Sequence, residues 1–211
     1  MKKFAVLFST ILVVFAALEV KAQVPEIGVA IGASYPKAPD KVGFDSAVKF
    51  NYKVNRIFLV GVESGFSWIN SEKRESEFFN ESNLDLAVVS SVNFYSVPVL
   101  GMITLNFPFG DYSPMSFFVS GGAGYSWTFY RGHESYTFAG FTWQALAGLA
   151  YAYSEDYGSM KLFCEIGYKG TSVKSDMENT GGQKVRVGLD MSAPFVRVGV
   201  AFPLGSSDYM Y

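Results

Sequence analysis

The stretch FFVSGGAGYSWTF, residues 117–129, alternates between two kinds of residue along its whole length. Apart from Gly121, every second residue counted from Phe117 is apolar or aromatic, and most of the residues between them are small or polar. Side chains of a strand point alternately to its two faces, so this period of two indicates a β-strand with one apolar and one polar face. The pattern leaves open which face is inside, because a soluble protein buries its apolar face whereas a membrane barrel shows it to lipid.

The start of the chain is organised like a secretory signal peptide. Residues 2–3 are lysines, residues 4–18 form an uncharged apolar run, and residues 20–22 read VKA, with small residues at the two positions that a signal peptidase reads. The run is shorter than the about 20 residues that a membrane-spanning helix needs. We therefore expect a signal peptide over residues 1–22 that directs export, followed by one domain over residues 23–211.

The composition of this expected domain excludes several classes of protein. Without residues 1–22, 14 basic and 18 acidic side chains remain, and no basic stripe suggests a nucleic-acid partner. Cys164 is the only cysteine, which excludes an intrachain disulfide. No later stretch is long and apolar enough for a transmembrane helix, and no GxSxG, P-loop, HExxH or metal-ligand pattern occurs. We therefore expect neither a cofactor nor a metal site.

Two-faced segments like residues 117–129 recur along the rest of the chain. With that stretch included, they predict eight strands, over residues 26–34, 44–52, 57–69, 94–107, 117–129, 141–153, 161–169 and 185–202. Ala193-Pro194 should introduce a bulge or kink in the last strand, because proline cannot donate to a ladder. Eight strands of this length with short connections favour an all-β fold, an eight-stranded antiparallel up-and-down barrel.

The breaks between these strands alternate in character. Those after the second, fourth and sixth strands are short, whereas the others are mostly longer and more polar and include expected loops at residues 71–85, 131–137 and 171–183. Transmembrane barrels have short periplasmic turns and long external loops. The alternation therefore favours a transmembrane barrel whose N-terminus lies in the periplasm.

The two faces of the predicted strands differ in charge. One face is apolar and aromatic and carries no charged residue. The other face carries the charged positions Asp45, Lys49, Glu63, Lys161, Glu165, Lys169 and Arg197. Burying several charges without very good pairing costs several kcal/mol each, whereas an uncharged face is what lipid requires. We therefore expect the apolar face to point outward and the charged side chains to form a network that fills a narrow lumen.

Two other interpretations of the lumen stay open at this point. The charged residues could line a small gated pore or a proton path. Glu63 and Glu165 could also form an acid/base pair, which only a narrow barrel would bring together, although no substrate cleft is evident.

Aromatic residues on the outward face sort by strand direction. The three tryptophans, Trp68, Trp127 and Trp143, fall at the rim that carries the long loops, and Tyr52, Phe107, Tyr153 and Phe202 fall at the opposite rim. Amphipathic rings gather at the two membrane interfaces, so these positions predict two aromatic girdles.

Three segments carry a resemblance to a known family. YSVPVLGMITLNF at residues 95–107, FFVSGGAGYSW at 117–127 and FVRVGVAFPL at 195–204 resemble strands of the small outer-membrane β-barrels of the OmpA/OmpX kind. The resemblance covers nearly all of the expected mature domain. It implies a cell outer-membrane location, contact with outer-membrane lipid, and insertion by the barrel-assembly machinery, which reads a terminal aromatic residue. Here Phe202 closes the last strand and PLGSSDYMY follows.

His133 is the only histidine, and with Ser135 it forms a His-x-Ser pattern similar to that of the outer-membrane lipid A deacylases. A nucleophilic serine needs a base within reach and a third group that orients the base. Members of that family carry a carboxylate about a dozen residues later, where this chain reads ALAGLAY. We therefore interpret His133 as a solvated loop residue and predict no catalytic site.

Together these patterns predict a monomeric, non-enzymatic outer-membrane barrel with a structural or surface-interaction role. External loops, above all residues 71–85 with Phe78-Phe79 in the middle, would contact an extracellular or host partner. Two alternatives are a lipid A-modifying hydrolase and a soluble periplasmic lipid-binding barrel.

Overall fold

The computed structural model describes residues 25–37, 39–71, 92–110, 113–132, 135–153, 160–178 and 184–204. These residues form nine strand segments: β1 Glu26–Ser34, β2 Gly43–Lys53, β3 Phe58–Ser71, β4 Val92–Pro108, β5 Met115–Arg131, β6 Ser135–Ala152, β7 Lys161–Glu178, β8 Lys184–Asp190 and β9 Ala193–Pro203. Among the described residues, no helix has the length and apolarity needed to cross a membrane.

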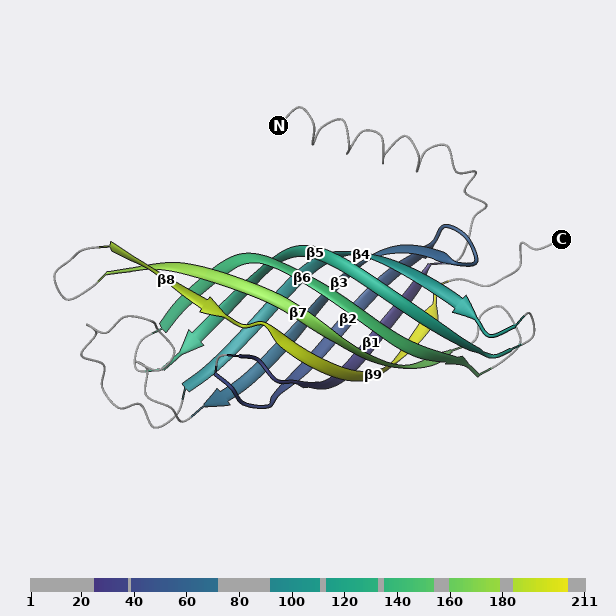
Figure 1. The fold of residues 1–211 in the computed structure, drawn as a ribbon, viewed down its shortest axis with the longest axis horizontal. Helices are drawn as coiled ribbons and strands as arrows, with labels where there is room; N and C mark the ends of the chain where they lie inside the picture. Colours follow the sequence, from purple (N-terminus) through teal and green to yellow (C-terminus); the bar gives the residue numbers. More distant parts are fainter. Residues whose placement is uncertain are drawn as a thin grey trace, which may run out of the picture.

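The strands close into a barrel (Figure 1). Each of β1 to β7 pairs antiparallel with the next in sequence, and β9 closes the ring by pairing with both β7 and β1. β8 and β9 pair with β7 in one continuous register, since Ser172 lies opposite Asp190 and Lys169 lies opposite Ala193. The two segments together therefore form one strand, and the predicted eight-stranded antiparallel barrel is confirmed.

The barrel has two different ends. The end where the described chain begins and finishes, here called the terminal end, also carries the β2–β3, β4–β5 and β6–β7 connections, and the opposite end is called the loop end. A local turn explains the first of these connections. The Asn55 side chain accepts hydrogen bonds from the backbone N–H groups of Ile57 at 2.9 Å and Phe58 at 2.7 Å, as asparagine commonly does in turns.

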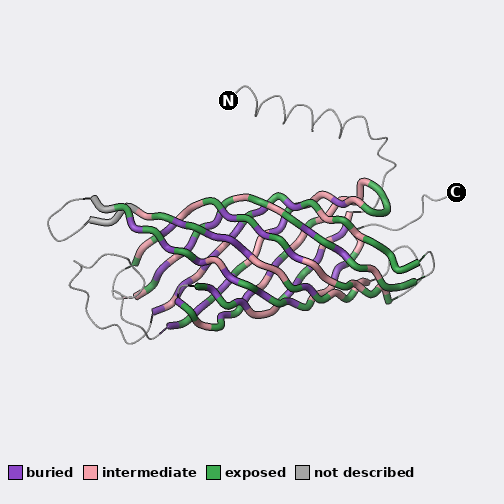
Figure 2. Tube along the Cα trace, in the orientation of Figure 1, coloured by how far each residue is buried: buried purple, intermediate pink, exposed green. Residues whose placement is uncertain are grey.

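Burial alternates along the described parts of the strands (Figure 2), because successive side chains point to the lumen and to the outer surface. The predicted outward orientation of the apolar face is correct: Phe141 is 61% exposed and Ile166 is 66% exposed. Other exposed apolar residues on this surface are Val29, Ile31, Phe44, Val48, Phe50, Val62, Phe66, Val99, Ile103, Leu105, Val119, Leu149, Leu162, Val196 and Val198. A soluble barrel would have buried this set, so that alternative is not supported.

Two hydroxyls on the outward face have partners within the wall of the barrel. Ser46 donates to the carbonyl of Phe66 at 3.1 Å, and Ser64 donates to the carbonyl of Pro98 at 3.0 Å. Lipid offers no hydrogen bonds, so an unpaired hydroxyl there would be costly. These bonds explain why two serines are tolerated among the lipid-facing positions.

Large inward side chains fill space that inward glycines leave. A Cβ atom at Gly148 would lie 2.5 Å from the Phe118 ring, and a Cβ atom at Gly199 would lie 2.5 Å from the Phe163 ring. Small barrels fill their interior by combining large and small inward residues in this way. The glycines of the polar face therefore have a packing role.

The predictions of two loops are wrong. β7 continues to Glu178 and β8 begins at Lys184, so most of the expected loop at residues 171–183 is strand. β6 begins at Ser135, inside the expected loop at residues 131–137. These strand ends carry polar residues outward and buried apolar residues inward, such as Val173 and Phe138, and their polarity resembled that of a loop.

The last strand is interrupted at Met191 and Ser192, next to the predicted irregularity at Ala193-Pro194. Pro194 has no N–H to donate, and its carbonyl instead accepts a 3.0 Å hydrogen bond from the N–H of Tyr35. The register on β7 is unchanged across the break, so the irregularity is a kink without an inserted residue.

Candidate functional site

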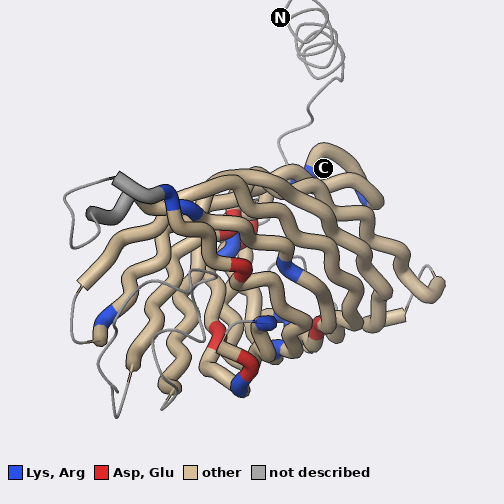
Figure 3. Tube along the Cα trace, turned by 60° about the vertical axis from the view of Figure 1, so that its left-hand side comes forward, with Lys and Arg blue, Asp and Glu red and all other residues tan. Residues whose placement is uncertain are grey.

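The charged side chains inside the barrel come mainly from strands on both sides of the β1–β9 seam. Figure 3 shows red and blue segments close together within a wall that is mostly uncharged. Arg197 on β9 is the centre of the group: its Nη1 lies 3.0 Å from Glu63 Oε1 and 3.4 Å from Asp45 Oδ1, and its Nε lies 2.7 Å from Glu165 Oε1. One guanidinium therefore contacts three carboxylates.

Two lysines complete this lumen ion network, which consists of Asp45, Lys49, Glu63, Glu165, Lys169 and Arg197. Lys169 Nζ lies 3.1 Å from Asp45 Oδ2 and 3.0 Å from Ser67 Oγ. Lys49 pairs with Glu165 and lies 3.6 Å from Glu63 Oε2. Three cations thus face three carboxylates, and the network is balanced in charge among its own members.

Neutral groups also hold the network in place. The Gln144 amide donates to Glu63 Oε1 at 3.0 Å, and the Ser67 hydroxyl donates to Asp45 Oδ2 at 2.6 Å. The guanidinium carbon of Arg197 lies 4.2 Å from the centre of the Phe195 ring, where a cation–π contact is favourable. Hydrogen bonds and ring contacts of this kind are what a buried charge needs to offset its desolvation.

The seventh predicted lumen residue, Lys161, lies apart from the other six. It pairs at the terminal end with Glu26, which also lies 2.9 Å from the ammonium group of Lys53. Sequence reasoning did not single out Glu26 or Lys53, because both lie at the very ends of their strands. The alternation of β1 and β2 could have placed both on the lumen face.

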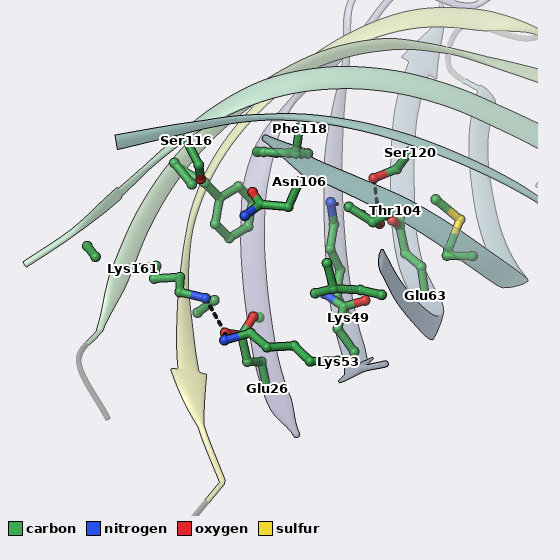
Figure 4. Close-up of a pocket in the computed structure, with 18 of the residues that line it drawn as sticks. Glu26, Lys49, Lys53, Glu63, Thr104, Asn106, Ser116, Phe118, Ser120 and Lys161 are labelled. Atoms are coloured by element: carbon green, nitrogen blue, oxygen red, sulfur yellow. Dashed lines mark hydrogen bonds and ion pairs between the residues drawn. The ribbon is translucent and has the colours of Figure 1, made fainter. Parts of the chain in front are cut away.

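A cavity of about 130 Å³ opens at the terminal end, beneath the network (Figure 4). Charged residues line it at Glu26, Lys49, Lys53, Arg56, Glu63 and Lys161. Apolar residues line it at Leu59, Met102, Phe118, Ala150, Phe163 and Ala201. The next cavity toward the loop end has a volume of only about 10 Å³, which is about the space of one water molecule.

The loop end is closed by an apolar layer inside the barrel. The layer consists of Ile69, Val92, Phe94, Tyr130, Phe138, Val173, Val187, Leu189 and Met191. Phe94 and Tyr130 pack edge-to-face with ring centres 5.3 Å apart, and both side chains are fully buried. Sequence reasoning missed this layer because it treated the inward face as polar along its whole length.

The outward face of the same strands becomes polar beyond the tryptophans. Exposed polar residues follow at Asn70, Arg131, Ser135, Thr137, Ser172, Lys174, Arg186 and Asp190. At the loop end the wall of the barrel is therefore polar outside and apolar inside, which is the reverse of its middle.

The outward aromatic residues lie at the two ends of the apolar band. Trp68, Trp127 and Trp143 are exposed toward the loop end, and Trp68 Nε1 donates to Asn93 Oδ1 at 3.0 Å. Phe107, Tyr153 and Phe202 are exposed toward the terminal end, and Tyr52 is partly exposed there. This placement is what two interfacial girdles require.

The expected hydrolase pair falls only in part on the described residues. His133 lies outside them, and Ser135 is the first residue of β6 and is exposed on its outward side. Within the described part of the chain, no cluster of His, Cys, Asp and Glu is suited to a metal ion. Cys164 is a free thiol on the outer surface.

Comparisons with known proteins agree with this architecture. Residues 8–202 match the family described as outer membrane protein beta-barrel domain. No curated protein sequence is similar to the chain. Among solved structures, Neisserial surface protein A shares 13% identity and a TM-score of 0.54, over 85% of this chain and 96% of that protein.

Two further structures are similar at lower scores. The attachment invasion locus protein of Yersinia pestis shares 14% identity and a TM-score of 0.41, over 85% of this chain and 95% of that protein. The outer membrane protease OmpT of Escherichia coli shares 8% identity and a TM-score of 0.45, over 90% of this chain and 100% of that protein. Identities this low concern the fold alone. Because the family match covers most of the sequence, the chain belongs to the outer membrane protein β-barrel family and lies in the outer membrane.

Proposed function

We propose that this protein is a non-enzymatic outer-membrane barrel that acts at the cell surface through its loop end. The observation that carries the proposal is the reversal of polarity along the strands. Phe94, Tyr130 and Phe138 are buried inside at the loop end, while Thr137 and Lys174 are exposed outside at that level. A basic side chain facing the middle of a bilayer costs about 2–4 kcal/mol, so this part of the wall belongs in water.

The lumen supports a surface role more than a transport role. The apolar layer fills the loop end, and the ion network is balanced in charge beneath it. Solutes would have to pass both, and among the described residues the larger cavity lies at the terminal end. An external partner would therefore contact the water-facing loop end and the loops attached to it.

The remaining parts of the proposal concern export, insertion and assembly. A signal peptide over residues 1–22 would direct export, the barrel-assembly machinery would insert the barrel with its terminal end in the periplasm, and the loop end would face outward. The eight strands close on one another without a second chain, which supports a monomer. The extracellular or host partner would contact the external loops.

Cysteine labelling in intact cells tests this orientation. In a Cys164→Ser background, Lys174→Cys at the loop end should react with a membrane-impermeant maleimide, because position 174 is exposed on the water-facing wall. Arg56→Cys, on the β2–β3 connection at the terminal end, is the matched control and should react only after the outer membrane is permeabilised. Labelling of position 56 but not of position 174 in intact cells would contradict the proposal.

A further inference from the structure

The terminal-end cavity has a built arrangement of charge at its mouth. Glu26 is buried, and the ammonium groups of Lys53 and Lys161 both contact its carboxylate. Figure 4 shows the two lysine side chains directed toward Glu26, Lys53 from the neighbouring strand β2 and Lys161 from β7, which lies beyond β9. A single carboxylate therefore holds two ammonium groups next to a cavity.

The lining of the cavity is positive on balance. Its described residues include four cations, Lys49, Lys53, Arg56 and Lys161, and two carboxylates, Glu26 and Glu63. Lys49 and Glu63 already belong to the lumen ion network. The groups left near the mouth thus favour an anion, and a cationic ligand would meet two ammonium groups and a guanidinium.

The inner wall of the cavity is apolar and aromatic. Phe118 and Phe163 meet edge-to-face with ring centres 6.4 Å apart, and Leu59 and Met102 line the cavity beside them. The volume is about 130 Å³, and an engineered cavity of about 150 Å³ in another protein accepts benzene. The space therefore suits one small ring.

We propose that the terminal-end cavity binds small aromatic monocarboxylates. The ligand carboxylate would lie at the mouth, where Lys53 and Lys161 can each donate to it, and the ring would lie against Phe118 and Phe163. Charge-assisted hydrogen bonds from two ammonium groups are strong enough to orient such a ligand. The site is independent of the proposed surface function, since it lies at the opposite end of the barrel.

Fluorine NMR with the barrel in lipid nanodiscs tests the site. The probe is 4-fluorobenzoate, and 4-fluorobenzamide is the neutral control of nearly the same shape. We expect saturable binding of the carboxylate and at least about tenfold weaker binding of the amide, which loses the charge-assisted hydrogen bonds. Absence of saturable binding, or equal binding of the two probes, would overturn the proposal.

Three variants separate charge from shape. Lys161→Met should weaken binding of 4-fluorobenzoate about tenfold by removing one charged donor, and Glu26→Gln should tighten it about tenfold by removing the internal competitor. Ala150→Phe should abolish binding by filling the cavity while leaving the charges in place. Binding that is insensitive to Lys161→Met and Ala150→Phe, or that weakens in Glu26→Gln, would overturn the site.

The folded state of each variant is checked by its heat-dependent mobility in SDS gels, which a closed barrel shows. If Lys161→Met fails this check, Lys53→Met removes the other ammonium group that contacts Glu26, with the same expected loss. Lys37→Met, outside the cavity on the β1–β2 connection, is the matched control and should bind like the unmodified protein.

Discussion

Among the described residues of the lumen, no other cation could take over the contacts that Arg197 makes. Its guanidinium contacts carboxylates from three strands, Asp45 on β2, Glu63 on β3 and Glu165 on β7. The planar group can donate in several fixed directions at once, which the point charge of a lysine cannot do. The three carboxylates are buried and depend on this one residue for much of their neutralisation.

Removing this side chain should therefore destabilise the barrel strongly. Arg197→Met keeps much of the volume but leaves three buried carboxylates short of a cation, and the free energy of unfolding should fall by about 3–5 kcal/mol. Urea titration of the detergent-solubilised protein measures the change. Lys37→Met is the control, because the Lys37–Asp190 pair is exposed and exposed pairs contribute at most about 1 kcal/mol. A small effect of Arg197→Met would show that the network is not needed for stability.

Two adjacent glycines on β5 should differ in their response to substitution by alanine. A Cβ atom at Gly122 would lie 2.2 Å from Met102 Sδ and 2.5 Å from the carbonyl oxygen of Gly101, so Gly122→Ala should destabilise the barrel by about 1–3 kcal/mol. At Gly121 the nearest atom would be 3.9 Å away, so Gly121→Ala should change stability by less than about 0.5 kcal/mol. The same urea titration compares them, and equal effects would contradict the packing described above.

At this scale, alternation in the sequence was enough to place the charged residues on the lumen face. It could not say which of them meet, because that depends on how the tilted strands bring β2 and β3 across to β7 and β9. Lys161 illustrates the limit, since it shares a face with Glu165 but pairs with Glu26 instead. The partners of the inward glycines were beyond prediction for the same reason.

At the scale of elements, the kink between β8 and β9 is held by side chains together with one backbone hydrogen bond to β7, from the N–H of Met191 to the carbonyl of Thr171 at 2.9 Å. The Ser192 hydroxyl accepts from the N–H of Thr171 at 3.1 Å, and the N–H of Ser192 donates to Asp190 Oδ1 at 3.0 Å. Lys37 lies on the other side of Asp190, with Nζ 3.8 Å from its Oδ2. Asp190 thus links the segment between β1 and β2 to the kink.

The kink should become weaker in acid. Partial burial acts to raise the pKa of the Asp190 carboxyl, but the hydrogen bonds from Ser192 and the charge of Lys37 outweigh it, so the pKa lies below its ordinary value of 3.8. A lowered pKa in the folded state means that the carboxylate stabilises the fold above pH 3.8 and that this contribution is lost as the pH falls through the folded pKa.

Comparison with Asp190→Asn isolates this effect. The difference in free energy of unfolding between the two proteins should be present at neutral pH and should shrink as the pH falls below about 4, because only the aspartate titrates. Urea titrations over a pH series measure it. A difference that stays constant with pH would show that the charge of Asp190 is not what holds the kink.

The strands were predictable where the membrane imposes its pattern and less so beyond it. β1 has the expected bounds, and β2 to β5 differ from expectation by one or two residues at each end. The errors concentrate at the loop-end parts of β6 and β7, where the apolar side chains turn inward and polar ones face water. Strands were recognised by an apolar face toward lipid. A segment whose outward face is polar lacks this face and therefore resembles a loop.

At the scale of the whole molecule, the interior changes character from end to end. The apolar layer closes the loop end, the ion network and the rings against it fill the middle, and the cavity opens at the terminal end. An ion entering from the terminal end would meet first paired charges and then a dry apolar layer. Each is a barrier of a different kind.

We therefore expect the purified barrel to show no ion conductance in planar lipid bilayers. The reason is that Phe94, Tyr130, Phe138 and Val173 are fully buried across the lumen, which leaves an ion no hydrated path. Single-channel recording at moderate voltage measures this, with an open porin as the positive control. Steady, ohmic channels from a preparation that keeps its heat-dependent gel mobility would contradict the closed lumen.

The ion network also has a consequence for the order of assembly. Asp45 and Glu63 come early in the chain, whereas Glu165, Lys169 and Arg197 come late, and the two groups meet only when β9 pairs with β1. Until that seam closes, Asp45 lacks both Lys169 and Arg197, and Glu63 has Lys49 but lacks Arg197. A half-inserted sheet would therefore expose an incompletely neutralised network, and we expect seam closure and the completion of the network to occur together, late in folding.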